Sequence, residues 1–171
     1  MHKLIVDGAV VEDSWQLVAE DQTPSLDELV NGNYLVSLAV WNGFVAQAKG
    51  ETVQTPPSNI GLYIASTELP EQITGDIGSI PVIAVTFPVF ADGRGFSIGR
   101  LLRQRYGYKG QLRAIGKPIR DQLSYLVRCG FNAFALADHY DPEQALASLK
   151  DFSESYQSAF DQPVPLFRRR G

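Results

Sequence analysis

The sequence predicts an α/β fold, a mainly parallel five-stranded sheet with helices on both faces and an N-terminal β-hairpin. The first observation is a series of short, almost wholly apolar runs that alternate with helical stretches, a pattern typical of parallel strands buried on both faces. The second is their number: five units are too few for an eight-stranded barrel, so a three-layer sandwich is favoured and a partial (β/α) barrel is the alternative. The predicted strands are 34–40, 60–65, 82–87, 111–115 and 133–137.

The first 32 residues form their own pattern. Residues 3–6 and 9–12 are short apolar runs on either side of Asp7-Gly8, a strong signal for a two-residue hairpin turn. Ser25 and Glu28 have the spacing of a capping box, which predicts a short helix that ends near Gly32. We expect one domain over residues 1–171, with residues 1–32 appended to it and an irregular basic tail at 163–171.

Helices are predicted between the strands. The clearest is Ser97–Tyr106, and 41–48 and 119–128 are further candidates. A final helix is predicted over 141–160, because Asp141 can cap it and a proline follows at its first position.

Composition argues against several classes of site. One cysteine, Cys129, excludes an intrachain disulfide and a cysteine-ligated iron–sulfur cluster, and two distant histidines make a zinc site improbable. No dinucleotide or phosphate-loop motif is present, so no cofactor or metal is evident. The sequence has neither a long apolar run nor a signal peptide, so we expect a cytoplasmic protein without a membrane span.

Charge is unevenly distributed along the chain. Nine basic residues and one acidic residue lie between Arg94 and Arg128, a balance of +8, whereas the whole chain carries −4 and the remainder therefore −12. This separation predicts an anionic ligand or an acidic partner.

The loop from Pro88 to Ser97 is the first candidate site. It leaves the best-defined strand and enters the best-defined helix, whose N–H groups and dipole favour an anion, and its glycines would let the backbone approach a ligand. The alternative is a tight turn in which Asp92 and Ser97 are structural caps. The candidate ligand-binding residues are Asp92, Gly93, Arg94, Gly95, Ser97 and Arg113.

Arg113 lies in the middle of a predicted buried strand. A buried arginine needs a carboxylate partner, for which Asp92 and Asp121 are candidates, or it points into a site. Asp92, Arg113 and Asp121 are therefore the candidate catalytic residues, with Asp92 as an acid–base or orienting group.

The helix after this loop suggests a docking surface. Ile98, Leu101 and Leu102 are expected to face the core, which would turn Arg100 and Arg103 outward. The candidate partner-binding residues are Arg100, Arg103, Arg105 and Arg120. Aromatic residues among these cations would also suit single-stranded nucleic acid, but the pI of about 5.1 makes that the least favoured alternative.

Several phrases within 87–136 resemble the signature of the bacterial DUF934 family: FPVFADGRGFS, LRQRYGYKGQLRAIG, RDQL and RCGFNAFAL. The resemblance implies a link to assimilatory sulfate reduction, because members are commonly encoded beside sulfite reductase and labelled as oxidoreductases of that step. It therefore implies an accessory protein that docks sulfite reductase or its electron donor, or holds an anionic ligand, through a basic face. The alternative is an enzyme or sensor that binds an oxyanion or phosphate at the C-terminal edge of the sheet.

Overall fold

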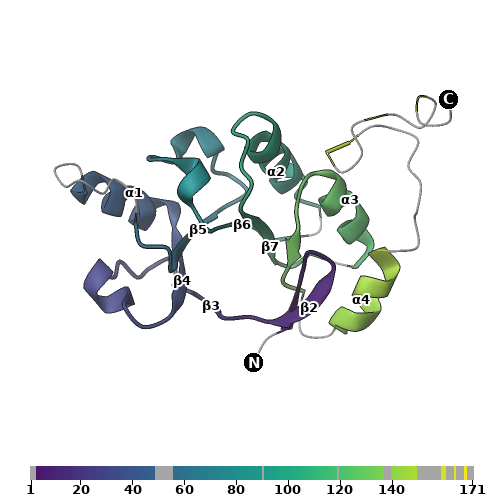
Figure 1. The fold of residues 1–171 in the computed structure, drawn as a ribbon, viewed down its shortest axis with the longest axis horizontal. Helices are drawn as coiled ribbons and strands as arrows, with labels where there is room; N and C mark the ends of the chain where they lie inside the picture. Colours follow the sequence, from purple (N-terminus) through teal and green to yellow (C-terminus); the bar gives the residue numbers. More distant parts are fainter. Residues whose placement is uncertain are drawn as a thin grey trace.

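A computed structural model of the chain describes residues 3–48, 56–89, 91–118, 120–136, 140–149, 159–160, 164 and 168. One eight-stranded sheet organises it, with the order β2-β1-β8-β7-β6-β5-β4-β3 (Figure 1). The strands are β1 (Lys3–Val6), β2 (Ala9–Glu12), β3 (Trp15–Leu17), β4 (Asn33–Ser37), β5 (Ile60–Ile64), β6 (Val82–Phe87), β7 (Gln111–Gly116) and β8 (Ala133–Phe134). The α-helices are α1 (Leu38–Gln47), α2 (Arg94–Gln104), α3 (Leu123–Arg128) and α4 (Pro142–Leu149), and the 3₁₀ turns are η1 (Leu26–Leu29), η2 (Pro70–Gln72), η3 (Ile77–Ser79) and η4 (Arg120–Gln122).

The sheet is mixed. Strands β3 to β8 pair in parallel, while β1 runs antiparallel both to β8 and to its hairpin partner β2. The hairpin is confirmed at its predicted bounds, because Asp7 and Gly8 both adopt positive φ, as a two-residue turn of this kind requires.

The sheet has to curl. Its two edge strands, β2 and β3, are joined by Asp13 and Ser14 alone. In a flat sheet, eight strands would place these edges about 34 Å apart, since neighbouring strands are separated by about 4.8 Å. The step from Glu12 to Trp15 can span only about 11 Å. The two edges therefore approach each other, and Figure 1 shows the sheet curled around an axis with the link from β2 to β3 closing the ring.

The predicted five-stranded parallel sandwich is therefore wrong, and the alternative, a partial barrel, fits. The described helices lie on the outer, convex side of the sheet, and none of them covers its concave side (Figure 1). The short strand β3 pairs in parallel with β4, and β1 extends the sheet beyond β8, so residues 3–17 contribute to both edges.

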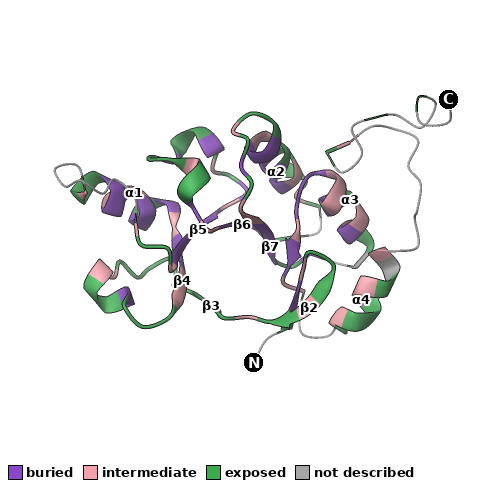
Figure 2. Cartoon of the chain, viewed as in Figure 1, coloured by how far each residue is buried: buried purple, intermediate pink, exposed green. Residues whose placement is uncertain are grey.

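Because the sheet is curled, each of its two faces has its own apolar core. The larger lies between the sheet and the helices and includes Ile83, Leu102 and Phe131. The smaller lines the concave side and includes Leu35, Tyr63, Val82, Ala84 and Ile115, with Trp15 packed against it. In Figure 2 buried, purple stretches follow the central strands β5, β6 and β7, whereas the edge strands β2 and β3 are mostly exposed.

Several element boundaries differ from those predicted. The run 34–40 is not one strand, because the Ser37 side chain accepts a hydrogen bond from the Val40 N–H and so caps α1, which begins at Leu38. Helix α2 begins at Arg94, three residues before Ser97. The predicted capping box is present, with the Ser25 N–H donating to Glu28 Oε2 at 2.7 Å, although it opens a single 3₁₀ turn. The final helix is described as far as Leu149, and most of 150–160 lies outside the described residues.

Candidate functional site at the C-terminal edge of the sheet

Two loops meet beyond the C-terminal ends of β5 and β6. The Asp92 carboxylate lies in the loop after β6 and accepts a hydrogen bond from Ser66 Oγ, in the loop after β5, at 2.6 Å. Arg94 forks onto the same carboxylate, with Nε 2.8 Å from Oδ1 and Nη2 2.8 Å from Oδ2. The Arg94 backbone N–H also donates to Oδ1, at 3.2 Å. Ser66, Asp92 and Arg94 therefore form one hydrogen-bonded unit at the place where ligands gather in α/β folds.

The two charged residues of this unit, Asp92 and Arg94, have different electrostatic roles. The hydrogen bonds from Arg94 and from Ser66 hold the pKa of the Asp92 carboxyl well below its usual range, and Asp92 in turn raises the pKa of Arg94. A carboxylate so strongly held is a weak base, so Asp92 is suited to orient Arg94 and poorly suited to accept protons. The Asp92 side chain is only 7% exposed, whereas that of Arg94 is 61% exposed. The unit presents a guanidinium of fixed direction to solvent.

Two glycines of α2, Gly95 and Gly99, have packing roles, whereas Gly93 does not. A Cβ at Gly95 would lie 2.6 Å from the Phe87 ring, and one at Gly99 would lie 2.3 Å from the Phe131 ring. These two glycines let α2 lie close against the sheet. This packing accounts for the missing side chain of Gly95 without a ligand, and a ligand-binding role for Gly95 stays a prediction. Gly93 has an ordinary φ of −81°, and a Cβ added there would come no closer than 3.9 Å to the Phe96 ring, so a side chain at this position meets no steric barrier.

Arg113 does not join this unit. Neither predicted partner, Asp92 or Asp121, reaches it: Arg113 Nη1 donates to both oxygens of Asp13, at 2.9 and 3.0 Å. With its amide oxygen turned toward Arg113, Gln111 accepts from Nε and Nη2 at 3.2 and 3.0 Å. Arg113 stands in register with Ala84 on the concave side and is 3% exposed, so it ties β7 to the link between β2 and β3.

The remaining candidates are dispersed. Ser97 is exposed in the first turn of α2, and Asp121 is exposed in η4. Lys117 lies beyond the end of β7, and its backbone N–H donates to the Phe87 carbonyl at 2.8 Å, which places a second exposed cation at this edge of the sheet.

Three of the four predicted docking arginines have side chains that the structure describes, and their environments differ. The prediction that Arg103 faces outward is wrong: it is 8% exposed and donates to the carbonyls of Gly130, Tyr108 and Gly110 and to the Asn132 side chain, at 2.6–3.1 Å. Arg105 pairs with Glu71 at 2.9 Å. Arg100 is exposed and bonds to the neutral Gln104 side chain. The side chain of Arg120 lies outside the described part of the structure.

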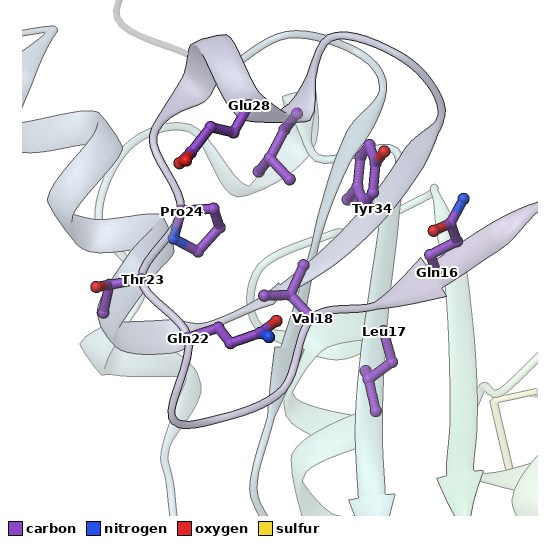
Figure 3. Close-up of a pocket in the computed structure, with 9 residues that line it drawn as sticks. Gln16, Leu17, Val18, Gln22, Thr23, Pro24, Glu28 and Tyr34 are labelled. Carbon is purple, nitrogen blue, oxygen red and sulfur yellow. The ribbon is translucent and has the colours of Figure 1, made fainter.

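A hollow in another part of the structure was not predicted from the sequence. It has a volume of about 490 Å³ and lies under the crossover from β3 to β4 (Figure 3). No motif indicated it, because it is formed by the incomplete cover that the single turn η1 gives to the outer face of β3. Its lining residues are Gln16, Leu17, Val18, Gln22, Thr23, Pro24, Glu28, Leu29 and Tyr34.

Among the described residues, no group of three or more histidine, cysteine, aspartate or glutamate side chains is arranged to hold a metal ion. Within the same residues, none of the helices has the length and apolar character needed to cross a membrane.

Comparison with known proteins gives one relationship. No curated protein and no solved structure matches the chain. The family model of DUF934, described as a bacterial protein of unknown function, matches residues 61–167, which include β6, the Asp92–Arg94 loop and β7. Because this match covers more than half of the chain, the protein belongs to the DUF934 family.

Proposed function

We propose that this protein binds a small oxyanion at the C-terminal edge of its sheet, through Arg94, as an accessory protein of assimilatory sulfite reduction. The link to sulfite reduction rests on what the resemblance to the family implies. The choice of ligand class rests on the chemistry of the site, since a guanidinium is the side chain best matched to an oxyanion.

The observation that carries the proposal is the fixed, exposed guanidinium of Arg94. Its fork onto Asp92 uses Nε and Nη2, and Ser66 holds the carboxylate from the other side. Arg94 is also the first residue of α2, an eleven-residue helix whose dipole adds to the positive potential there. An arginine oriented before a ligand arrives loses less side-chain entropy on binding. Because Asp92 is held as a weak base, the site supports binding or sensing better than proton transfer.

Arg105 provides a matched control for the test. Like Arg94 it belongs to the α2 region, is paired with one carboxylate and is largely exposed, at 64% against 61%. Calorimetric titration with sulfite, sulfate and phosphate should detect binding to the wild type and to Arg105→Met. Arg94→Met should lose at least about tenfold in affinity, the effect of removing one or two charge-assisted hydrogen bonds. Equal losses in both variants, or no binding of these anions by the wild type at low salt, would refute the proposal.

A second function, docking of an acidic partner, is favoured by the surface around Arg100. The Phe96 and Tyr125 rings meet edge to face at 4.8 Å between α2 and α3, and Tyr125 is 54% exposed. Exposed tyrosine and arginine together are the residues most enriched at binding hot spots. If sulfite reductase or its electron donor docks here, Arg100→Glu should weaken the complex and added salt should weaken it further. Sedimentation of the mixed proteins at low salt that shows no complex would remove this alternative.

A further inference from the structure

The hollow beside β3 has walls that are fixed in the absence of a ligand. The Asn59 side-chain amide donates to the carbonyls of Leu29 and Gly32, both at 2.8 Å, and so fixes the end of η1. The Tyr34 hydroxyl donates to the Asn31 carbonyl at 2.7 Å. The volume of the hollow, about 490 Å³, falls within the range of small-molecule sites, and its walls do not have to be ordered on binding.

The lining combines an apolar floor with one carboxylate. Val18 and Leu29 are buried lining residues and, with Pro24, form apolar surface. Figure 3 shows Val18 and the Pro24 ring on this surface. Glu28 stands at the side of this surface (Figure 3), and the two bonds from Ser25, through its N–H and its hydroxyl, both go to Glu28 Oε2. These bonds lower the pKa of Glu28 and keep it ionised. Among the described residues no hydrogen bond is made to Oε1, so that oxygen can accept one from a ligand.

The surrounding chain is acidic and almost without cations. Lys49 is the only basic residue between Lys3 and Arg94, and it lies outside the described residues. The segment around the hollow adds three more carboxylates, Glu20, Asp21 and Asp27. The carboxylates of this segment therefore contribute a negative potential at the hollow.

We infer that this hollow is a binding site for an organic cation, an amine or guanidinium on an aliphatic stem, whose charged group bonds to Glu28 while its stem covers Val18 and Leu29. Gln16, Gln22 and Thr23 line the same hollow and supply polar groups that can fix the orientation of the ligand. Such a cation can be a free small molecule or the side chain of a lysine or arginine in a partner protein. This site is separate from the Arg94 site in charge, in the elements that form it and in the ligand that it takes.

Agmatine and a short blocked peptide with one arginine are the probes for the test. Titration of the ¹⁵N-labelled full chain at low salt should shift amide signals within residues 16–34, which include every lining residue, and added salt should weaken the binding. Glu28→Gln is the informative variant, because glutamine preserves a capping box and therefore the turn. It should lower affinity by about tenfold or more, through loss of a hydrogen bond to an ionised group. Asp27→Asn is the matched control, since it removes one charge from the same turn at a residue that does not line the hollow. Its affinity should fall far less than that of Glu28→Gln, and equal losses in the two variants would overturn the inference.

The probes also distinguish the two sources. Tighter binding of agmatine indicates a free cation, and tighter binding of the peptide indicates a partner's side chain; either result supports the site if Glu28→Gln weakens it. Absence of shifts with both probes at millimolar concentration overturns the inference. So does unchanged affinity in Glu28→Gln, or shifts confined to residues outside 16–34. None of these outcomes bears on oxyanion binding by Arg94, which is measured with the opposite charge.

Discussion

The ion pair between Arg113 and Asp13 should be a major determinant of stability, and a double-mutant cycle can measure it. Arg113 is 3% exposed and Asp13 17% exposed, and the two residues are 100 positions apart in the sequence. Removing one member of a buried pair leaves the other as an uncompensated charge, which typically costs about 3–5 kcal/mol. Arg113 is the more deeply buried member, so its isolation should be the more costly.

The two single variants should therefore differ. Asp13→Ala leaves the guanidinium with Gln111 as its remaining partner among the described residues, and we expect a loss of about 3–5 kcal/mol. Arg113→Met leaves Asp13, which still accepts from the Trp15 N–H at 3.0 Å and can contact water, so the expected loss is about 1–3 kcal/mol. The double variant should be close to Arg113→Met and more stable than Asp13→Ala, because no charge is left buried.

Urea unfolding at neutral pH, followed by circular dichroism with the slope checked for constancy, measures these differences. Asp13→Asn is the control for the turn, since an asparagine side chain can still accept from the Trp15 N–H while it lacks the charge. An Asp13→Ala variant less than about 1 kcal/mol below the wild type, or additive losses in the double variant, would refute the reasoning that the pair closes the curl of the sheet.

Two further predictions follow from the candidate site and its helix. Gly99→Ala places a methyl group against the buried Phe131 ring and should cost about 1–3 kcal/mol in urea unfolding, whereas Gly93→Ala should change stability by less than about 0.5 kcal/mol; equal effects would contradict the packing role of Gly99. The lowered pKa of Asp92 makes its contribution to stability complete above the unfolded-state pKa of about 3.9, and that contribution should decline as the pH falls from there toward the lower folded-state pKa. Asp92→Asn should lack this part of the acid dependence. Thermal midpoints of the wild type and of Asp92→Asn, measured between neutral and acid pH, test this. Parallel curves for the two proteins would contradict a contribution of Asp92 to stability.

Elements defined by neighbouring residues could be predicted from the sequence. Strand β6 occupies the predicted residues 82–87, and the hairpin around Asp7-Gly8 has the predicted register, because apolar β-branched runs and turn residues act locally. The closeness of Asp92 and Arg94 could be predicted for the same reason, since the two residues are neighbours in the same loop. Ser66 could not, because its hydrogen bond to Asp92 joins two loops that are 26 residues apart and have no shared motif.

The predicted orientation of Arg103 is wrong for an identifiable reason. The predicted buried face runs through the large apolar residues Ile98, Leu101 and Leu102. In the structure the closest contacts of α2 with its neighbours are made where Gly95 and Gly99 have no side chains, which turns the buried face toward Arg103. A glycine adds nothing to the apolar periodicity of a helix. A prediction based on large side chains therefore places the centre of the buried helix face too far from the glycines.

The family match and the folding unit differ in extent. The matched segment, 61–167, contains β6 to β8 and all but the first residue of β5, yet β4 covers one side of this parallel group and β1 the other. Without residues 3–37, both sides of the group would be open edges, which are prone to pair with other chains. The same residues supply Asp13, the partner of the buried Arg113, from outside the matched segment. A site beyond the ends of β5 and β6 is therefore positioned by a sheet whose closure depends on the first strands of the chain, and any functional assay of the matched segment needs those strands in place.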